Sequence, residues 1–193
     1  MLKVILILAG LALLAVVVGV GCKATRAGYE SAPYKVVRHD GAFEVRDYPA
    51  LTLVETPMAA SGDDGSFSRL FNYITGRNAA RQKIAMTTPV FMAGSATNAT
   101  MAFVMPETMT AGQVPQPTDA AVKVREIEPG RFAVFRYSGG RNPKKETAAL
   151  TRLQTWMAAE KLTTQSEPVF GYFDPPWTLT FLRRNEVMIR TGP

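Results

Sequence analysis

The segment FEVRDYP, residues 43–49, is echoed later in the chain by VKVREIEP, residues 122–129. Both segments read as an apolar residue, a charged residue, Val, Arg, an acidic residue and an apolar residue, and both end at a proline. Alternation of apolar and charged residues is typical of a strand with one buried face, and proline marks the turn that follows. The echo predicts that the folded part of the chain contains two copies of one structural unit.

The same order of elements is expected around each copy. The first copy is predicted to have strands at 43–47 and 50–56, a helix at 66–76, and strands at 83–91 and 100–106. The second is predicted to have strands at 122–126 and 131–139, a helix at 146–161, and strands at 167–173 and 185–190. Ser66 is the expected N-cap of the first helix, Gly76 its stop, and Pro89 predicts a bulge, a bend or an edge position. Two β-β-α-β-β halves indicate an antiparallel α+β domain with a curled or closed sheet and its helices outside.

The first 22 residues have a different character. Lys3 precedes an apolar and glycine run from Val4 to Val20, and small residues lead from there to Cys22. This resembles a bacterial lipoprotein signal, in which the cysteine is lipidated after cleavage, although Gly19 stands where that signal usually has a large aliphatic residue. The run is also long enough to span a bilayer as an uncleaved single-pass anchor, and ordinary cleavage is the third alternative.

These features predict how the chain is divided. We expect residues 1–22 to be a signal or membrane anchor, 23–33 to be a tether, and 34–193 to be one folded domain. The domain would lie outside the cytoplasm or at least on a membrane, either on the periplasmic face or as an outer-membrane lipoprotein.

The composition of the chain argues against several classes of function. The chain has 193 residues, 47% of them hydrophobic, and a net charge of +6. Its basic residues are scattered rather than arranged in a stripe with aromatics, which argues against nucleic acid as a partner. A single cysteine excludes an intrachain disulfide, and a single histidine, His39, excludes a multi-histidine metal site. Common catalytic motifs are absent from the sequence, so we expect a monomeric binding domain rather than an enzyme.

Three segments together resemble the SOUL haem-binding protein family. They are FEVRDYPA (43–50), KIAMTTPVFM (83–92) with MAFVMP (101–106), and GYFDPPWTLTFLRRNEVMI (171–189). The resemblance extends in order from about Tyr34 to Arg190. It implies a distorted antiparallel eight-stranded barrel with two flanking helices, and haem or another tetrapyrrole as the ligand.

The resemblance also implies where the tetrapyrrole binds, namely a groove between the first helix and the loop before the last strand. On this chain the implied apolar walls are Phe67, Leu70, Phe71, Ile74, Trp177, Leu179 and Phe181, and the implied propionate partners are Arg183 and Arg184, with Arg69 or Arg77 assisting. Some members carry a histidine after the first-strand arginine, implicated as an axial iron ligand, but here Asp47 follows Arg46. His39 could take that role only through a register shift, so we expect apolar contact and arginine–propionate pairing without an obligatory iron ligand.

Other interpretations of these residues stay open. The apolar face of the first helix is also what core packing requires, and the stretch from Arg183 to Glu186 could be a structural hydrogen-bond cluster. The main alternative function is an effector-binding-type module for another amphipathic hydrophobic ligand, in which Glu44, Asp47 and Glu126 would line the site of a cation. An enzyme that uses Glu186 or Asp174 as an acid or base ranks last.

Overall fold

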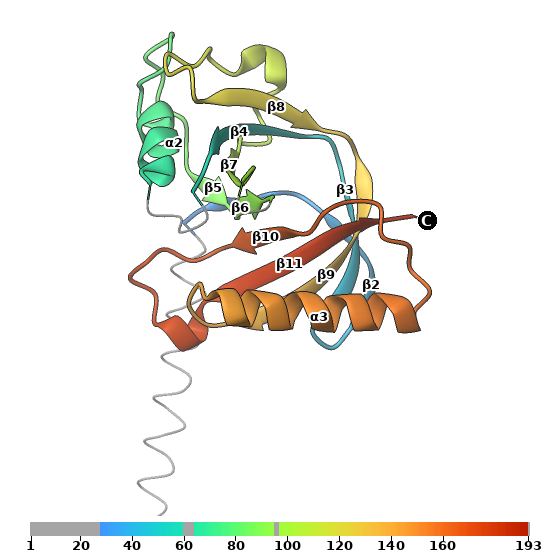
Figure 1. The fold of residues 1–193 in the computed structure, drawn as a ribbon. Coiled ribbons are helices and arrows are strands. Elements are labelled where there is room, and N and C mark those ends of the chain that lie inside the picture. Colours follow the sequence, from blue (N-terminus) through green and yellow to red (C-terminus); the bar gives the residue numbers. More distant parts are fainter. Residues whose placement is uncertain (1–27, 60–63, 95–96, 193) are drawn as a thin grey trace, which may run out of the picture.

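The computed structural model describes residues 28–59, 64–94 and 97–192. Nine strands form one antiparallel sheet in the order β2-β3-β9-β11-β10-β6-β7-β4-β8 (Figure 1). Their bounds are β2 Lys35–Asp40, β3 Phe43–Tyr48, β4 Leu51–Pro57, β6 Val90–Ala93, β7 Thr100–Val104, β8 Lys123–Ile127, β9 Gly130–Ser138, β10 Val169–Tyr172 and β11 Arg184–Thr191. The short strands β1 (Glu30–Ser31) and β5 (Thr87–Thr88) pair with each other in parallel.

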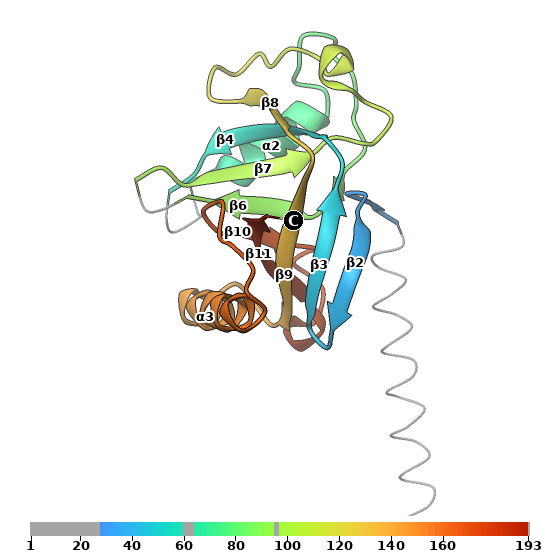
Figure 2. The same cartoon turned by 90° about the vertical axis from the view of Figure 1, so that its right-hand side faces the viewer.

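The two echoing segments are β3 and β8, and they hold equivalent positions. β3 precedes β4 in the chain but pairs with β9, while β8 precedes β9 but pairs with β4. One half of the sheet is therefore β8-β4-β7-β6, the other is β3-β9-β11-β10, and the halves meet where β6 pairs with β10. The predicted duplication and α+β class are confirmed, and the sheet curls into a half-barrel (Figure 2).

The two long helices lie on the outside of this curl. Helix α2 (Ser66–Ile74) packs on β4 and β7, and α3 (Pro143–Ala159) packs on β9 and β11. Ser66 is the first helical residue rather than the N-cap, because Gly65 takes the cap position and the Asp64 carboxylate accepts the Ser66 N–H. Helix α3 begins three residues earlier than expected, where the Asn142 side chain accepts the N–H groups of Lys144 and Lys145.

Two strand predictions need correction. The segment 83–91 is not one strand, since only β5 and β6 are extended and the cis peptide bond before Pro89 separates them. Strand β2 was not expected from the sequence. All six of its residues are exposed at the edge of the sheet, so KVVRHD carries no buried face for alternation to reveal.

Three apolar clusters make up the core, one under α2, one under α3 and one on the concave face of the sheet. Every buried member of these clusters lies between Ala32 and Ile189. The described residues from 32 to 189 therefore supply all the buried members of these three clusters. Within the described part of the chain, no helix is both long and apolar enough to cross a bilayer. The predicted anchor, residues 1–22 with Cys22, lies outside the described residues.

Candidate functional site

The loop between β10 and β11 exposes three large apolar side chains. Trp177, Leu179 and Phe181 are 70%, 55% and 67% exposed. Phe181 lies in the 3₁₀ turn η2 (Thr180–Leu182), and Leu179 is the residue at its N-cap. The loop is nevertheless well anchored. At the start of the loop, the Asp174 carboxylate accepts the backbone N–H of Arg184, which lies at the end of the loop, at 2.6 Å. Arg183 donates to two backbone carbonyls inside the loop. Because these hydrogen bonds hold the backbone of the loop, little conformational entropy is lost when its side chains bind a ligand.

The four predicted residues of α2 separate into two pairs. Leu70 and Ile74 are buried in the cluster between the helix and the sheet, so they support the helix from below. Phe67 and Phe71 are each 45% exposed, and their rings stack with centroids 5.9 Å apart. Only the second pair presents apolar surface to solvent, because the helix buries one face and these two residues lie at its margin.

The two exposed groups do not meet in the structure. In Figure 1, α2 lies at the top of one side of the molecule and the loop between β10 and β11 at the bottom of that side, and the perpendicular view of Figure 2 keeps them apart. Neither of the two cavities described below is lined by residues of α2 or of this loop.

The predicted arginines already have partners. Arg183 donates its Nε to the Thr178 carbonyl at 2.9 Å and an Nη to the Pro176 carbonyl, which fixes the loop. Arg184 donates to Glu186 and to the Tyr34 hydroxyl, and its guanidinium lies 4.1 Å from the centre of the Phe173 ring.

The two arginines of the α2 region differ from each other. Arg69 donates to Thr56, to the Pro57 carbonyl and to Asp64. Arg77, just after α2, is exposed. Of the four arginines expected near the ligand, Arg69, Arg77, Arg183 and Arg184, only Arg77 takes no part in the side-chain hydrogen bonds given above for the described residues.

Behind the loop, the concave face of the sheet contains a buried ionic cluster. Arg46 and Glu186 are both fully buried and pair bidentately, at 2.7 and 2.9 Å, from β3 to β11. Arg46 also donates to Glu44 at 2.6 Å, and its guanidinium lies 4.1 Å from the centre of the Tyr34 ring. Arg184 and Arg136 approach the same carboxylates from the partly exposed side. Every carboxylate of this cluster is therefore paired, which argues for a structural role.

The cluster gives the fold a pH dependence. Burial alone would raise the pKa of Glu44, but the hydrogen bond and charge of Arg46, with those of Arg136, lower that pKa below its usual value of 4.5. A carboxyl whose pKa is lower in the folded state contributes stability above the unfolded pKa and loses it as pH falls through the folded one.

We therefore expect wild type to be more stable than Glu44→Gln at pH 7, and the difference to shrink as pH falls below about 4.5. Urea unfolding of both proteins at pH 7, 5, 4 and 3 measures it. A difference that stays constant over this range would contradict the assignment.

His39 and Asp47, the two residues that bear on an axial iron ligand, lie on β2 and β3, outside α2 and the loop between β10 and β11. His39 lies on the exposed strand β2 with its Nε2 3.9 Å from the nearer Glu44 oxygen, and its side chain is 61% exposed. Asp47, which follows the first-strand arginine, pairs with Arg131 at 2.7 and 2.9 Å. Among the described residues, no group of three or more His, Cys, Asp or Glu side chains could hold a metal ion.

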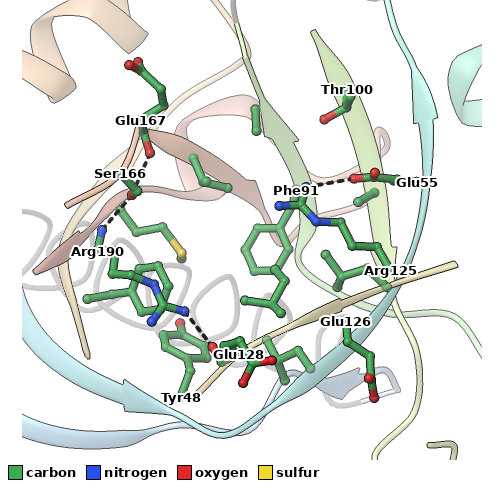
Figure 3. Close-up of a pocket in the computed structure, with 18 of the residues that line it drawn as sticks. Tyr48, Glu55, Phe91, Thr100, Arg125, Glu126, Glu128, Ser166, Glu167 and Arg190 are labelled. Atoms are coloured by element: carbon green, nitrogen blue, oxygen red, sulfur yellow. Dashed lines mark hydrogen bonds and ion pairs between the residues drawn. The ribbon is translucent and has the colours of Figure 1, made fainter. Parts of the chain in front are cut away.

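A cavity that the sequence did not predict lies on the concave face, between the two halves of the sheet. It has a volume of about 640 Å³, and Figure 3 shows strands of both halves around it. Its walls are apolar, and they are formed by Leu51, Leu53, Phe91, Ala93, Ala102, Ile127, Phe132, Val169 and Met188. A second, smaller cavity lies between the start of α3 and the β6–β7 connection. Of the residues expected to line a cation site, Glu44 and Asp47 do not border the first cavity. Glu126 reaches its rim, but it lies opposite Thr52 on the face of the sheet toward α2, and in Figure 3 its side chain points away from the cavity.

Comparison with models of known protein families shows which family this chain belongs to. The model of the family described as "SOUL heme-binding protein" matches residues 29–190, which is nearly the whole described domain. The chain belongs to this family. Membership in SOUL confirms the resemblance seen in the sequence, and it identifies the chain generally as a haem-binding protein of a family of binding proteins. Among curated proteins, none matches the sequence.

Solved structures share the SOUL fold at low sequence identity. The C-terminal domain of EcmrR superposes with a TM-score of 0.59 at 9% identity, over 82% of this chain and 98% of that one. A hydrolase from Listeria innocua superposes with a TM-score of 0.58, also at 9% identity, over 81% of this chain and 94% of that one. At such identities the likeness shows the fold alone.

Proposed function

We propose that this SOUL protein is a monomeric carrier or buffer of haem and related tetrapyrroles, without catalytic activity of its own. We further propose that residues 1–22 anchor it, through lipidated Cys22 or as a single span, on the outer side of a membrane. The observation that carries the binding proposal is the ordered loop with its exposed Trp177, Leu179 and Phe181 in a member of a haem-binding family.

The chemistry of a porphyrin suits this surface. A porphyrin is a large apolar plate with two propionates on one edge, and removing apolar area from water contributes about 25 cal/mol per Å². The loop supplies one wall. Helix α2, which carries the exposed Phe67 and Phe71, lies on the same side of the molecule as the loop in Figure 1.

Arginines at the rim would hold the propionates. Arg183 lies in the loop itself, and its Nη1 makes no hydrogen bond within the described part of the chain. Arg77 is the exposed candidate beside α2, while Arg184 and Arg69 hold the scaffold.

Iron is not required for binding of this kind. The position after the first-strand arginine is an aspartate engaged with Arg131, and His39 lies on a strand distant in sequence from the loop. The affinity would then come from the faces and edge of the macrocycle, which ferric haem and iron-free protoporphyrin have in common.

Spectroscopic titration of the full-length protein with both compounds tests the proposal. We expect ferric haem and protoporphyrin to bind with dissociation constants within about tenfold of each other, in the micromolar range or tighter. The matched variant His39→Ala should leave both unchanged. Binding of haem alone, with a Soret shift lost in His39→Ala, would identify His39 as an iron ligand. Failure of both compounds to bind above an unrelated control protein would reject tetrapyrrole carriage.

A further inference from the structure

The loop between β10 and β11 concentrates exposed apolar surface at one end of the molecule. Among the described residues, seven large apolar side chains are exposed, and three of them, Trp177, Leu179 and Phe181, fall within five consecutive positions. Neither of the two cavities described above is lined by this loop. The three side chains therefore project into solvent, and a partner must cover them from outside rather than enter a pocket.

The backbone of the loop suits a poorly hydrated environment. Five of its carbonyl groups, those of residues 175, 176, 178, 179 and 180, accept hydrogen bonds from donors within the loop. Pro175 and Pro176 have no N–H group that needs a partner. Unpaired backbone polar groups are what keeps irregular loops out of lipid. Pairing of these carbonyls therefore lowers the cost of moving the loop out of water.

Two lysines border the same loop. The turn between β9 and α3 packs against it, since a Cβ at Gly140 would lie 3.2 Å from the methyl carbon of Thr180. Lys144 and Lys145 follow in the first turn of α3, next to the loop in Figure 1, and both are exposed. Neither lysine makes an ion pair within the described part of the chain.

The acidic side chains nearest to these lysines and to the loop in sequence are already engaged. Glu146 accepts the Tyr172 hydroxyl at 2.6 Å and lies 3.6 Å from Arg141, with only 18% of its side chain exposed. The Asp174 carboxylate accepts the backbone N–H of Arg184. These carboxylates therefore do not neutralise the two lysines, and the lysines give the rim of the loop a positive charge.

We propose that this loop contacts a lipid bilayer with anionic headgroups. Trp177, Leu179 and Phe181 enter the zone between headgroups and acyl chains, where aromatic side chains are favoured. Lys144 and Lys145 lie at the headgroups and attract anionic lipids. A bilayer is fluid, so it can cover the three side chains without a pocket on the protein.

This contact is separate from the two functions proposed above. It does not rest on tetrapyrrole binding, although both contacts would use Trp177. An anchor at residues 1–22 would hold the chain on a membrane, but it would not determine which face of the domain touches the lipid. The loop would determine that face.

Quenching of fluorescence by brominated lipids tests the proposal on the full-length protein. The chain has two tryptophans, and because Trp156 is buried against Phe43, Trp177 reports on the loop. The vesicles contain phosphatidylcholine and phosphatidylglycerol, with or without bromine on the acyl chains. We expect bromine to lower the emission by about a third or more, because the side chain would lie about 5–10 Å deep.

Two outcomes of this measurement would overturn the contact. Equal emission from brominated and unbrominated vesicles would show that the loop stays out of the lipid, even where an anchor holds the chain nearby. Quenching that persists in Trp177→Phe would come from Trp156, and the loop would not be its source. We expect Trp177→Phe to abolish the quenching.

Charge reversal tests the lysines. Lys144→Glu/Lys145→Glu should lower the quenching at least about threefold, since the attraction to anionic lipid is lost, while acidic residues in the first turn of α3 remain compatible with the helix. Lys83→Glu/Lys123→Glu makes the same change of charge at two exposed positions in the half that carries α2, and should have no effect. Vesicles of phosphatidylcholine alone should act like the first variant. Equal quenching in all of these cases would overturn an anionic surface as the partner.

Titration with protoporphyrin in the absence of vesicles separates this proposal from tetrapyrrole binding. Lys144→Glu/Lys145→Glu should bind protoporphyrin like wild type. If protoporphyrin binds but Trp177 is not quenched in vesicles, the bilayer contact fails and tetrapyrrole carriage stands. If Trp177 is quenched in vesicles but no tetrapyrrole binds, carriage fails and the bilayer contact stands.

Discussion

Replacement of Arg46 by alanine should lower the free energy of unfolding by about 3–5 kcal/mol. The substitution leaves Glu186 buried without its bidentate partner and removes the hydrogen bond from Arg46 to Glu44. Both carboxylates are buried or nearly so. Arg184 still pairs with Glu186 and Arg136 with Glu44 through their Oε1 atoms, but the Oε2 atom of each carboxylate loses the hydrogen bond that Arg46 donates, and a buried oxygen without a partner costs free energy. Urea unfolding at pH 7 measures the loss.

The adjacent ion pair provides a matched control. Arg131 pairs with Asp47, the next residue of β3, with similar bidentate geometry, but both side chains are about a third or more exposed. Arg131→Ala should therefore cost less than about 1 kcal/mol. Similar small losses in the two variants would show that the buried cluster has no special importance for stability.

The repeat in the sequence was enough to predict most of the fold. Alternating residues at 43–49 and 122–129 mark strands that hold equivalent places in the two halves. The sequence could not predict that β3 pairs with β9 of the other half and that β8 pairs with β4. Alternation indicates that a strand has a buried face, but it does not indicate which strand lies beside it. Strand β2 was missed for the opposite reason, since an edge strand with all residues exposed needs no alternation.

The candidate site was less accessible from the sequence, for two physical reasons. The apolar stripe of α2 has the same spacing whether its residues face the core or a ligand, and the structure buries Leu70 and Ile74 while it exposes Phe67 and Phe71. The cavity is lined from eight strands, from Glu128 just after β8 and from the segment before β10. No sequence window contains it, because each strand contributes only one to three residues. In contrast, DPPWTLTF indicated an exposed loop directly, since prolines and a large aromatic outside any periodic pattern rarely belong to a core.

Replacement of Trp177 by alanine should weaken tetrapyrrole binding by about 30-fold or more, which corresponds to about 2 kcal/mol. A tryptophan supplies a large rigid surface at low entropic cost, and here the loop already holds it in place through Arg183 and Asp174. Because the side chain is 70% exposed, the free energy of unfolding should change by no more than about 0.5 kcal/mol. Fluorescence or absorbance titration with protoporphyrin measures the affinity, and urea unfolding measures the stability.

Three further substitutions, in α2, determine how far the site extends. Phe67→Ala and Phe71→Ala should weaken binding if the plate also rests on α2, whereas Leu70→Ala should destabilise the fold by about 2–5 kcal/mol, because its side chain is fully buried. If only the α2 variants lower the affinity, the tetrapyrrole binds on the helix and Trp177 is not part of the site. If neither group matters, the exposed aromatics are not the binding surface. A loss shared by Trp177→Ala and Phe67→Ala would mean that the ligand spans both groups. Because the two groups do not touch in the described residues, that result would also require the loop or the helix to move toward the other when the ligand binds.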